Sequence, residues 1–174
     1  MKYLVKFFVV TFFLLVSTYT FAEQKIVVLD MKVILNTSKA GKGAQDYLKK
    51  TFNDNQKKYQ KMEKDLKKEE TDLLAKKNIL SQEEYTKKTN ELRKKVIDYQ
   101  SDRRSSLDKI ATQRAVAREN LLKEVNPIID EYIKENNISL VMDKKNMIGG
   151  KTEFDITKEI IEKLNKKLPS LTIK

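Results

Sequence analysis

The feature that most constrains this chain is an apolar residue repeated at every seventh position from about residue 44 onward. This spacing is typical of a helix that packs along a partner helix in a coiled coil. One heptad position holds Phe52, Tyr59, Leu66 and Leu73, and the interleaved position holds Leu48, Asn55, Met62 and Glu69. A closed core would not accept an asparagine and a glutamate without partners, so we expect a two-helix seam that is partly wet.

A second helix with a matching pattern is predicted to run back along the first. Asn78 ends the first helix, and Ser81 with Glu84 three residues later has the pattern of a capping box. The heptad positions that follow are Tyr85, Leu92, Tyr99, Ser106 and Gln113, with Thr89, Val96, Arg103, Ile110 and Ala117 between them. The first helix, from about Ser38 to Lys77, would be on the order of 60 Å long. With only four Gly and two Pro in 174 residues, the composition suits a long antiparallel hairpin.

Short apolar runs near both ends of the chain predict a small β-containing body. Residues 25–30 (KIVVLD) and 138–143 (ISLVMD) are rich in β-branched or large apolar side chains, as strands are. Residues 146–148 are a third candidate strand, reached through a tight turn. Gly149 and Gly150 then break the pattern.

Helical segments are expected to join these strands to the hairpin. Residues 31–35 are too few to form an independent helix, and the small residues that follow them permit close packing. The apolar stripe of residues 121–133 is wider than a coiled-coil seam, so this end should dock on the body, with a kink at Pro127. Thr157 is expected to cap a last amphipathic helix that ends at about Leu168.

We therefore divide the chain into a signal peptide (1–22), a β-rich oligomerisation body (23–35 and 136–174) and a helical hairpin (36–135). A body of this size cannot bury enough apolar surface to be stable alone. Its short strands would also leave unpaired edges, which proteins normally cover or pair. Oligomerisation through a shared sheet or barrel is the simplest remedy.

The first residues are typical of a secretory signal. Lys2 and Lys6 are followed by uncharged residues 7–16, and Thr20 and Ala22 supply the small side chains that a signal peptidase requires. Cleavage after Ala22 would lower the net charge from +11 to +9. The alternative, an uncleaved anchor, is disfavoured because the uncharged run is shorter than the roughly 20 residues that span a bilayer. Since the chain has no cysteine, neither a lipid anchor at the cleavage point nor a disulfide is possible.

Composition argues against an enzyme. Histidine and cysteine are absent, which removes the commonest general base, the thiol nucleophile and most zinc ligands. The acids that could be imagined as a catalytic pair flank the predicted turn, where charges are usually solvated: Glu69, Glu70, Glu83 and Glu84. The glycines at 41 and 43 lack the Gly-Lys-Ser/Thr ending of a phosphate loop. We expect no catalytic residue, metal, cofactor or small-molecule substrate.

The hairpin is moderately basic, with 24 Lys or Arg and 18 Asp or Glu in residues 36–135. Lysines gather toward the turn, where they could attract acidic polypeptide, anionic lipid or lipopolysaccharide, with solubility as the alternative reason for them. The candidate anion contacts are Lys76, Lys77, Lys87 and Lys88. The tyrosines have helical spacing and belong to the seam, so specific nucleic-acid binding is not expected.

These segments together resemble the Skp/OmpH family of periplasmic chaperones. The resemblance is carried by residues 25–35 (KIVVLDMKVIL), 38–42 (SKAGK), 138–148 (ISLVMDKKNMI) and 154–164 (FDITKEIIEKL), with a charged hairpin between them. It implies a homotrimer in which strands of three subunits form a central β-barrel and three hairpins project from it like tentacles. It also implies an ATP-independent holdase that binds unfolded outer-membrane β-barrel proteins, prevents their aggregation and assists their delivery to the outer membrane.

In such a chaperone, dispersed apolar and cationic contacts on the hairpins would hold a client without fixing its fold. The candidate client contacts are Tyr59, Met62, Leu66, Leu74, Ile79, Leu80, Tyr85 and Leu92. Two alternatives remain open at this point. One is a structural envelope coiled coil that spaces other components, and the other is a basic protein that binds lipopolysaccharide or nucleic acid, which the positive charge favours.

Overall fold

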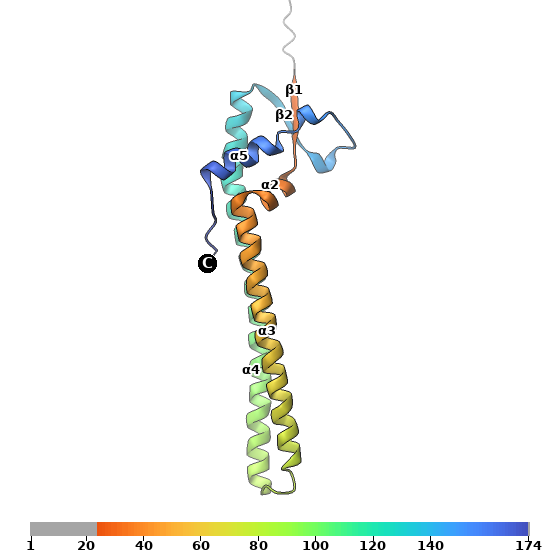
Figure 1. The fold of residues 1–174 in the computed structure, drawn as a ribbon, viewed down its shortest axis with the longest axis vertical. Coiled ribbons are helices and arrows are strands. Elements are labelled where there is room, and N and C mark those ends of the chain that lie inside the picture. Colours follow the sequence, from red (N-terminus) through yellow and green to blue (C-terminus); the bar gives the residue numbers. More distant parts are fainter. Residues whose placement is uncertain (1–23, 174) are drawn as a thin grey trace, which may run out of the picture.

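The computed structural model describes residues 24–173, so the predicted signal peptide lies outside the described residues. Two long helices, α3 (Lys39–Ala75) and α4 (Gln82–Glu135), form an antiparallel hairpin that projects from a small body (Figure 1). The body contains the strands β1 (Lys25–Leu29) and β2 (Ile138–Asp143) and the helices α2 (Met31–Thr37) and α5 (Thr157–Lys167). The predicted class, mainly α with a small β body and a long helical hairpin, is confirmed.

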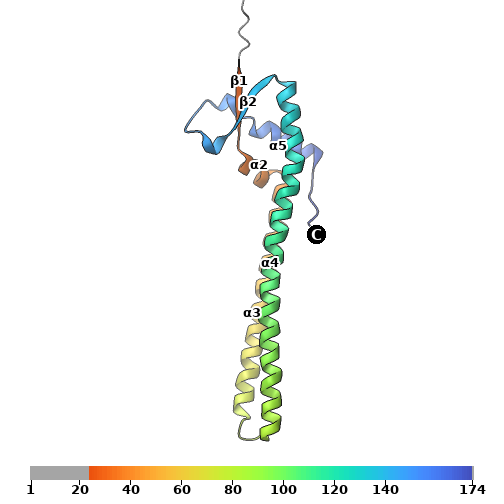
Figure 2. The same cartoon turned by 180° about the vertical axis from the view of Figure 1, so that it is seen from behind.

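The two strands pair in parallel although the whole hairpin separates them in the sequence. Ile26 is paired with Leu140, and Leu29 with Asp143. The connection between them is the hairpin itself, because the chain leaves the body through α3 and returns through α4 (Figure 2). On the other side of β1, the amide of Ile156 donates to the carbonyl of Val28 at 2.9 Å. Within the described chain, β1 is therefore flanked on both sides and β2 has an open edge.

The core of the body lies where the sheet meets the end of α4 and the helix α5. Ile160 and Leu164, four residues apart on one face of α5, are both fully buried. They pack in a cluster with the buried residues Val27, Leu29, Ile34, Val125, Ile128, Ile138 and Ile156. The wide apolar stripe of α4 thus docks on the body as predicted, and α4 continues as one helix past Pro127.

Residues 31–35 were expected to be too few for an independent helix, and they lie in helix α2, which packs against the body. The Asp30 carboxylate caps α2 by accepting from the amide of Val33 at 2.9 Å. Ile34 and Leu35 are buried, Ile34 in the main core and Leu35 in a smaller cluster with Leu121. Tertiary burial stabilises a helix that would be marginal in isolation, and local sequence does not report it.

The corner between α2 and α3 depends on small residues. Ser38 is completely buried, and its hydroxyl caps α3 by accepting from the amide of Gly41 at 3.2 Å. A Cβ on Gly41 would lie 2.0 Å from the carbonyl oxygen of Leu35. The predicted close packing is therefore confirmed at Gly41. A Cβ on Gly43 would meet nothing within 4 Å, so only one of the two glycines is needed for it.

The predicted third strand at residues 146–148 is wrong. Residues Lys144–Asn146 form a 3₁₀ turn instead, followed by an irregular segment. The Asp143 carboxylate accepts from the amide of Lys145, a local bond that favours a turn over an extended strand. The expected tight turn is present, but within residues 24–173 no third strand pairs with β2 after it.

Thr157 does not cap α5 as predicted but begins it, and the position before it is Ile156. The Thr157 hydroxyl accepts from the amide of Asp30 at 2.8 Å and donates to the Asp155 carboxylate. Lys144 forms an ion pair with the same carboxylate. We call Asp30, Lys144, Asp155 and Thr157 the polar clasp, because they tie the loop before α5 to the end of β1.

The polar clasp predicts a pH dependence of stability. Partial burial acts to raise the pKa of Asp155, but hydrogen bonds from Lys144 and Thr157 outweigh it and hold the pKa below its ordinary value. A carboxyl with a depressed pKa stabilises the fold above its unfolded pKa of about 3.9 and loses this effect as the pH falls through the folded value. We expect Asp155→Asn to lower the thermal midpoint at pH 7, and this difference to narrow below about pH 4. A difference that stays constant with pH would contradict this.

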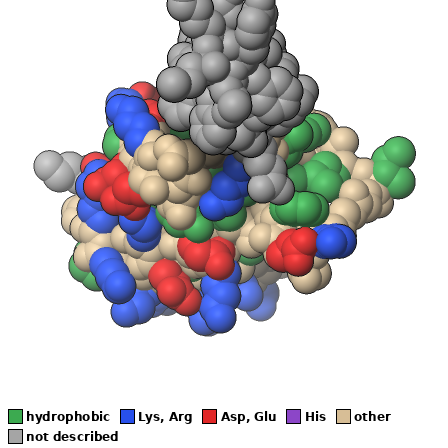
Figure 3. Space-filling model, turned by 90° about the horizontal axis from the view of Figure 1, so that it is seen from above, with side chains coloured by type: hydrophobic (Ala, Val, Ile, Leu, Met, Phe, Trp, Pro, Cys, Tyr) green, Lys and Arg blue, Asp and Glu red, His purple; other side chains and the backbone are tan. Residues whose placement is uncertain are grey.

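The outer surface of the body is unevenly apolar. Seen from the body end, apolar side chains gather on one side, and charged side chains on the other (Figure 3). The exposed apolar residues of the body include Ile26, Leu140, Met142, Ile148 and Phe154. Among residues 24–173, no helix is both long and apolar enough to cross a bilayer.

Candidate functional site

The seam between α3 and α4 follows the predicted heptads closely. All the predicted positions are buried or half-buried except Phe52 on α3 and Arg103 on α4, which are exposed. Thr51 takes the half-buried place beside Phe52. Near the body the seam contains small side chains: Ala44 on α3 and Ala117 on α4 line one groove, and Ala40 packs with Leu121.

The middle of the seam is polar, as the sequence predicted. The Asn55 side-chain amide donates to the Ser106 hydroxyl at 2.6 Å. The Tyr59 hydroxyl donates to the backbone carbonyl of Asp102 at 3.0 Å, and its ring meets the Tyr99 ring edge-on, 6.1 Å between centroids. These bonds satisfy the polar groups that a two-helix interface leaves half in water.

The other polar heptad residue, Glu69, also has a partner. Lys95 of α4 forms an ion pair with it at 2.6 Å, with both side chains about half exposed. An ion pair this exposed contributes roughly 0.2–1 kcal/mol to the free energy of unfolding, so this seam position adds little stability. The hairpin is therefore a thin two-helix layer with a weakly apolar seam.

The candidate client contacts divide into two groups. Five lie in the seam, where they hold the helices together: Tyr59, Met62, Leu66, Tyr85 and Leu92. Leu80, in the turn, is half-buried. Only Leu74 and Ile79 are freely accessible, with 58% and 81% of their surface exposed. Whether these residues contact a client stays a prediction, but accessibility favours the second group.

Other exposed apolar side chains on the hairpin were missed by the sequence reasoning. They are Tyr47, Phe52, Ile97, Leu107 and Val116. Phe52 occupies a heptad position, so pattern alone assigned it to the seam. Ile97, Leu107 and Val116 each follow or precede a seam residue by one position, and this offset was the available signal that they flank the seam.

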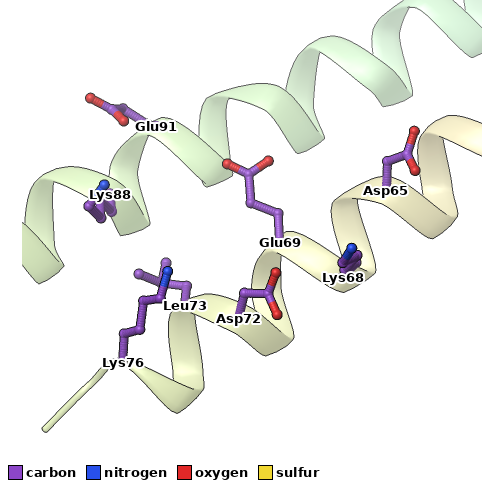
Figure 4. Close-up of a pocket in the computed structure, with 8 residues that line it drawn as sticks. All are labelled: Asp65, Lys68, Glu69, Asp72, Leu73, Lys76, Lys88 and Glu91. Carbon is purple, nitrogen blue, oxygen red and sulfur yellow. The ribbon is translucent and has the colours of Figure 1, made fainter. Parts of the chain in front are cut away.

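The four candidate anion contacts are all exposed near the turn. Lys76 and Lys88 line a shallow hollow of about 350 Å³ between the helix ends, together with Lys68 (Figure 4). Four carboxylates line the same hollow: Asp65, Glu69, Asp72 and Glu91. Mixed charges do not make this hollow a selective anion site, and anion binding at the tip stays a prediction.

The turn ends in the predicted capping box, which is confirmed. The Ser81 hydroxyl accepts from the Glu84 amide at 3.3 Å, and the Glu84 carboxylate accepts from the Ser81 amide at 3.1 Å. Hydrogen bonds from the Ser81 hydroxyl and then its amide lower the pKa of Glu84. The box fixes where α4 starts.

Loss of this cap should have a modest effect. We expect Ser81→Ala to lower the free energy of unfolding by about 1 kcal/mol, because the Glu84 amide loses the Ser81 hydroxyl as its acceptor and the Glu84 carboxylate loses the hydrogen bond from that hydroxyl. Ser105→Ala, at an exposed interior position of the same helix, is the matched control and should be neutral or slightly stabilising. Equal midpoints in urea unfolding for both variants would show that the box contributes nothing.

Comparison with known proteins shows which family has this architecture. The family model described as "Outer membrane protein (OmpH-like)" matches residues 25–164. A "Skp-like protein" of Pseudomonas aeruginosa is 26% identical over 169 residues, covering 95% of this chain and 98% of that protein. A crystal structure from Caulobacter crescentus CB15, described as an OmpH-like outer membrane chaperone, superposes with a TM-score of 0.81 at 18% identity. The match covers 91% of this chain and 94% of that one. Since the family model spans both strands, the complete hairpin and most of α5, this chain belongs to the OmpH-like outer membrane protein family.

Proposed function

We propose that this chain is an ATP-independent holdase that binds unfolded outer-membrane β-barrel proteins, prevents their aggregation and assists their delivery to the outer membrane. The observation that carries the proposal is the slender hairpin whose accessible apolar side chains are scattered rather than gathered in one pocket. Leu74, Ile79, Ile97 and Leu107 are each at least 47% exposed, on a hairpin that is otherwise largely charged. Many weak contacts of this kind hold an unfolded chain without selecting one conformation.

Family membership supports the same proposal, since the Caulobacter crescentus neighbour is described as an outer membrane chaperone. Unfolded barrel proteins alternate apolar and polar residues and aggregate through their strand edges. Folding into the membrane provides a deeper energy minimum, so release needs no nucleotide. We further propose that the chain is exported to the periplasm, with its signal peptide cleaved after Ala22.

We also propose that the working form is a homotrimer in which the strands of three bodies form a β-barrel. The support is the open edge of β2 together with the exposed side chains of Ile26, Leu140 and Met142 on the two strands. An open edge beside exposed apolar side chains favours pairing with a second copy. A trimer would also place three hairpins around one enclosed space.

The proposed function is tested by diluting an outer-membrane barrel protein from urea into buffer with the purified mature chain and no ATP. We expect light scattering to be suppressed once the trimer is in excess over the client. A structural envelope protein would leave aggregation unchanged, and that result would overturn the holdase proposal. A binder of lipopolysaccharide or nucleic acid would show steeply salt-dependent binding of those polyanions without suppressing client aggregation.

A further inference from the structure

A groove of about 790 Å³ lies between α3 and α4 at the end of the hairpin nearest the body, beside α2. Small side chains form much of it, among them Ala44 on α3 and Ala111 and Ala115 on α4. Larger apolar side chains, Leu48 and Phe52, bound it on the α3 side. It is separate from the turn, where Leu74, Ile79 and the lysine cluster lie.

The groove is shaped by a mismatch in side-chain size. Ala44 is buried in the seam, whereas Ala111 and Ala115 are exposed beside the seam residues Ile110 and Ala117. Because these alanines bring little volume, they leave a hollow along the seam that larger side chains would fill. Phe52 is 43% exposed although it occupies a heptad position, which leaves its ring available at the groove. The volume lies within the range of about 300–1,000 Å³ that is typical of ligand sites.

The charges on the groove are predominantly positive. Lys49, Arg114 and Arg118 line it, with Asp46 as the one acidic residue. Arg114 and Arg118 are four residues apart, so two like charges are neighbours on one helix face, which costs a few tenths of a kcal/mol. Within residues 24–173, neither guanidinium has a hydrogen bond or ion pair with a carboxylate. A bound carboxylate would relieve this repulsion.

The length of the groove fits a short piece of extended polypeptide. From Ala111 to Leu121 the helix rises on the order of 15 Å. An extended chain advances about 3.3 Å per residue, so about five residues span this distance. Successive side chains of a strand point to opposite faces, so when the apolar side chains lie in the groove the intervening side chains face the water. Arg114 and Arg118 are exposed, and their long side chains can reach carboxylates on that side of the segment.

We propose that this groove binds an extended client segment in which acidic residues alternate with apolar ones. The inference rests on the proposed holdase function and adds a defined subsite to it. The apolar side chains fill the hollow between the helices, and the carboxylates pair with Arg114 and Arg118. One side of the segment stays in water. An open groove therefore suits such a segment better than it suits a lipid chain, which would need an enclosed site.

The test uses fluorescence anisotropy of a short labelled peptide of alternating leucine and glutamate, titrated with the mature protein. We expect Arg114→Gln with Arg118→Gln to weaken binding about fivefold at low salt, because two partly exposed ion pairs are lost. Ala111→Leu fills the hollow and should weaken binding without changing the charge. Arg104→Gln, an exposed arginine that does not line the groove, is the matched control and should bind as the native chain does.

A second peptide of alternating leucine and glutamine separates charge recognition from apolar contact. Its binding should be weaker than that of the acidic peptide and unaffected by the double arginine change.

Equal affinities of all variants for the acidic peptide would overturn the proposal. So would a change in the sedimentation of the double variant with unchanged peptide affinity, because another copy would then occupy the groove. If aggregation is suppressed by every variant but peptide affinities are equal, the groove proposal fails and the holdase proposal stands. If the native chain binds the peptide but does not suppress aggregation, the holdase proposal fails and the groove proposal stands.

Discussion

Substitution of Gly41 by alanine is expected to destabilise the protein by about 3 kcal/mol, which is at the upper end of the usual cost of overpacking. The new Cβ would lie 2.0 Å from the carbonyl oxygen of Leu35 and 2.9 Å from the Ser38 hydroxyl. The nearest atom belongs to the backbone of α2, so it cannot move aside as a flexible side chain could. Either α2 shifts and exposes Ile34, or the first turn of α3 opens.

The matched control for this change is Gly43→Ala in the same helix. Its Cβ meets nothing within 4 Å, so only the helix propensity changes, and stability should rise by roughly 0.5–1 kcal/mol. Urea unfolding followed by circular dichroism measures both variants. If both alanines raise the midpoint, the corner is looser than described and the account of Gly41 is wrong.

Substitution of Leu140 by lysine is expected to convert the proposed trimer into monomers. The side chain is 49% exposed in the single chain, but in a barrel shared between copies it would lie in the interface. Burying an unpaired ammonium there would cost several kcal/mol. Sedimentation at micromolar concentration measures the change directly. Because three linked hairpins gain avidity that single ones lack, suppression of client aggregation per chain should fall by about tenfold or more.

Ile97→Lys is the control for the sedimentation measurement alone, because Ile97 is among the side chains proposed to contact clients. Ile97 is 58% exposed on α4, away from both strands, so the lysine should leave the assembly intact. A Leu140→Lys chain that sediments like the native protein would show that copies do not associate through this strand. A native chain that is monomeric at all concentrations would remove the trimer proposal altogether.

Much of the hairpin could be predicted from sequence because its determinants are local. The heptads that place Leu66 opposite the returning helix, and the Ser81–Glu84 capping box, depend on residues within a few positions of each other. Strands β1 and β2 were also predictable, since short apolar runs between polar residues leave few alternatives. Their parallel pairing was not predicted, because no local signal specifies which strands meet.

The features that the sequence did not specify depend on contacts between residues that are far apart in the chain. Helix α2 is stabilised by burial of Ile34 against residues far away in the sequence, which a short window does not contain. Thr157 has the chemistry of a cap, but its hydroxyl is engaged by Asp30 and Asp155. Phe52 and Thr51 compete for one inward place, and packing against α4 decides between them.

The candidate site was the least predictable part. Apolar residues such as Tyr59 and Met62 could serve the seam or a client, and sequence spacing is the same for both. The groove between the helices was not anticipated, since it arises from alanines on two segments that come together only in the fold. What the pattern did establish is that charge and apolar surface are interspersed along the hairpin.

The parallel pairing of β1 and β2 imposes an order on assembly. A chain that enters its compartment amino terminus first presents β1 long before the partner strand has emerged. Contacts around the turn join residues that are close in sequence, so they form quickly. The pairing of β1 with β2 forms only after the whole hairpin has been brought into place. The pairing of β1 with β2 is therefore completed last. A chain that ends before β2 lacks this pair and, if copies associate through β2 as proposed, would not join the trimer.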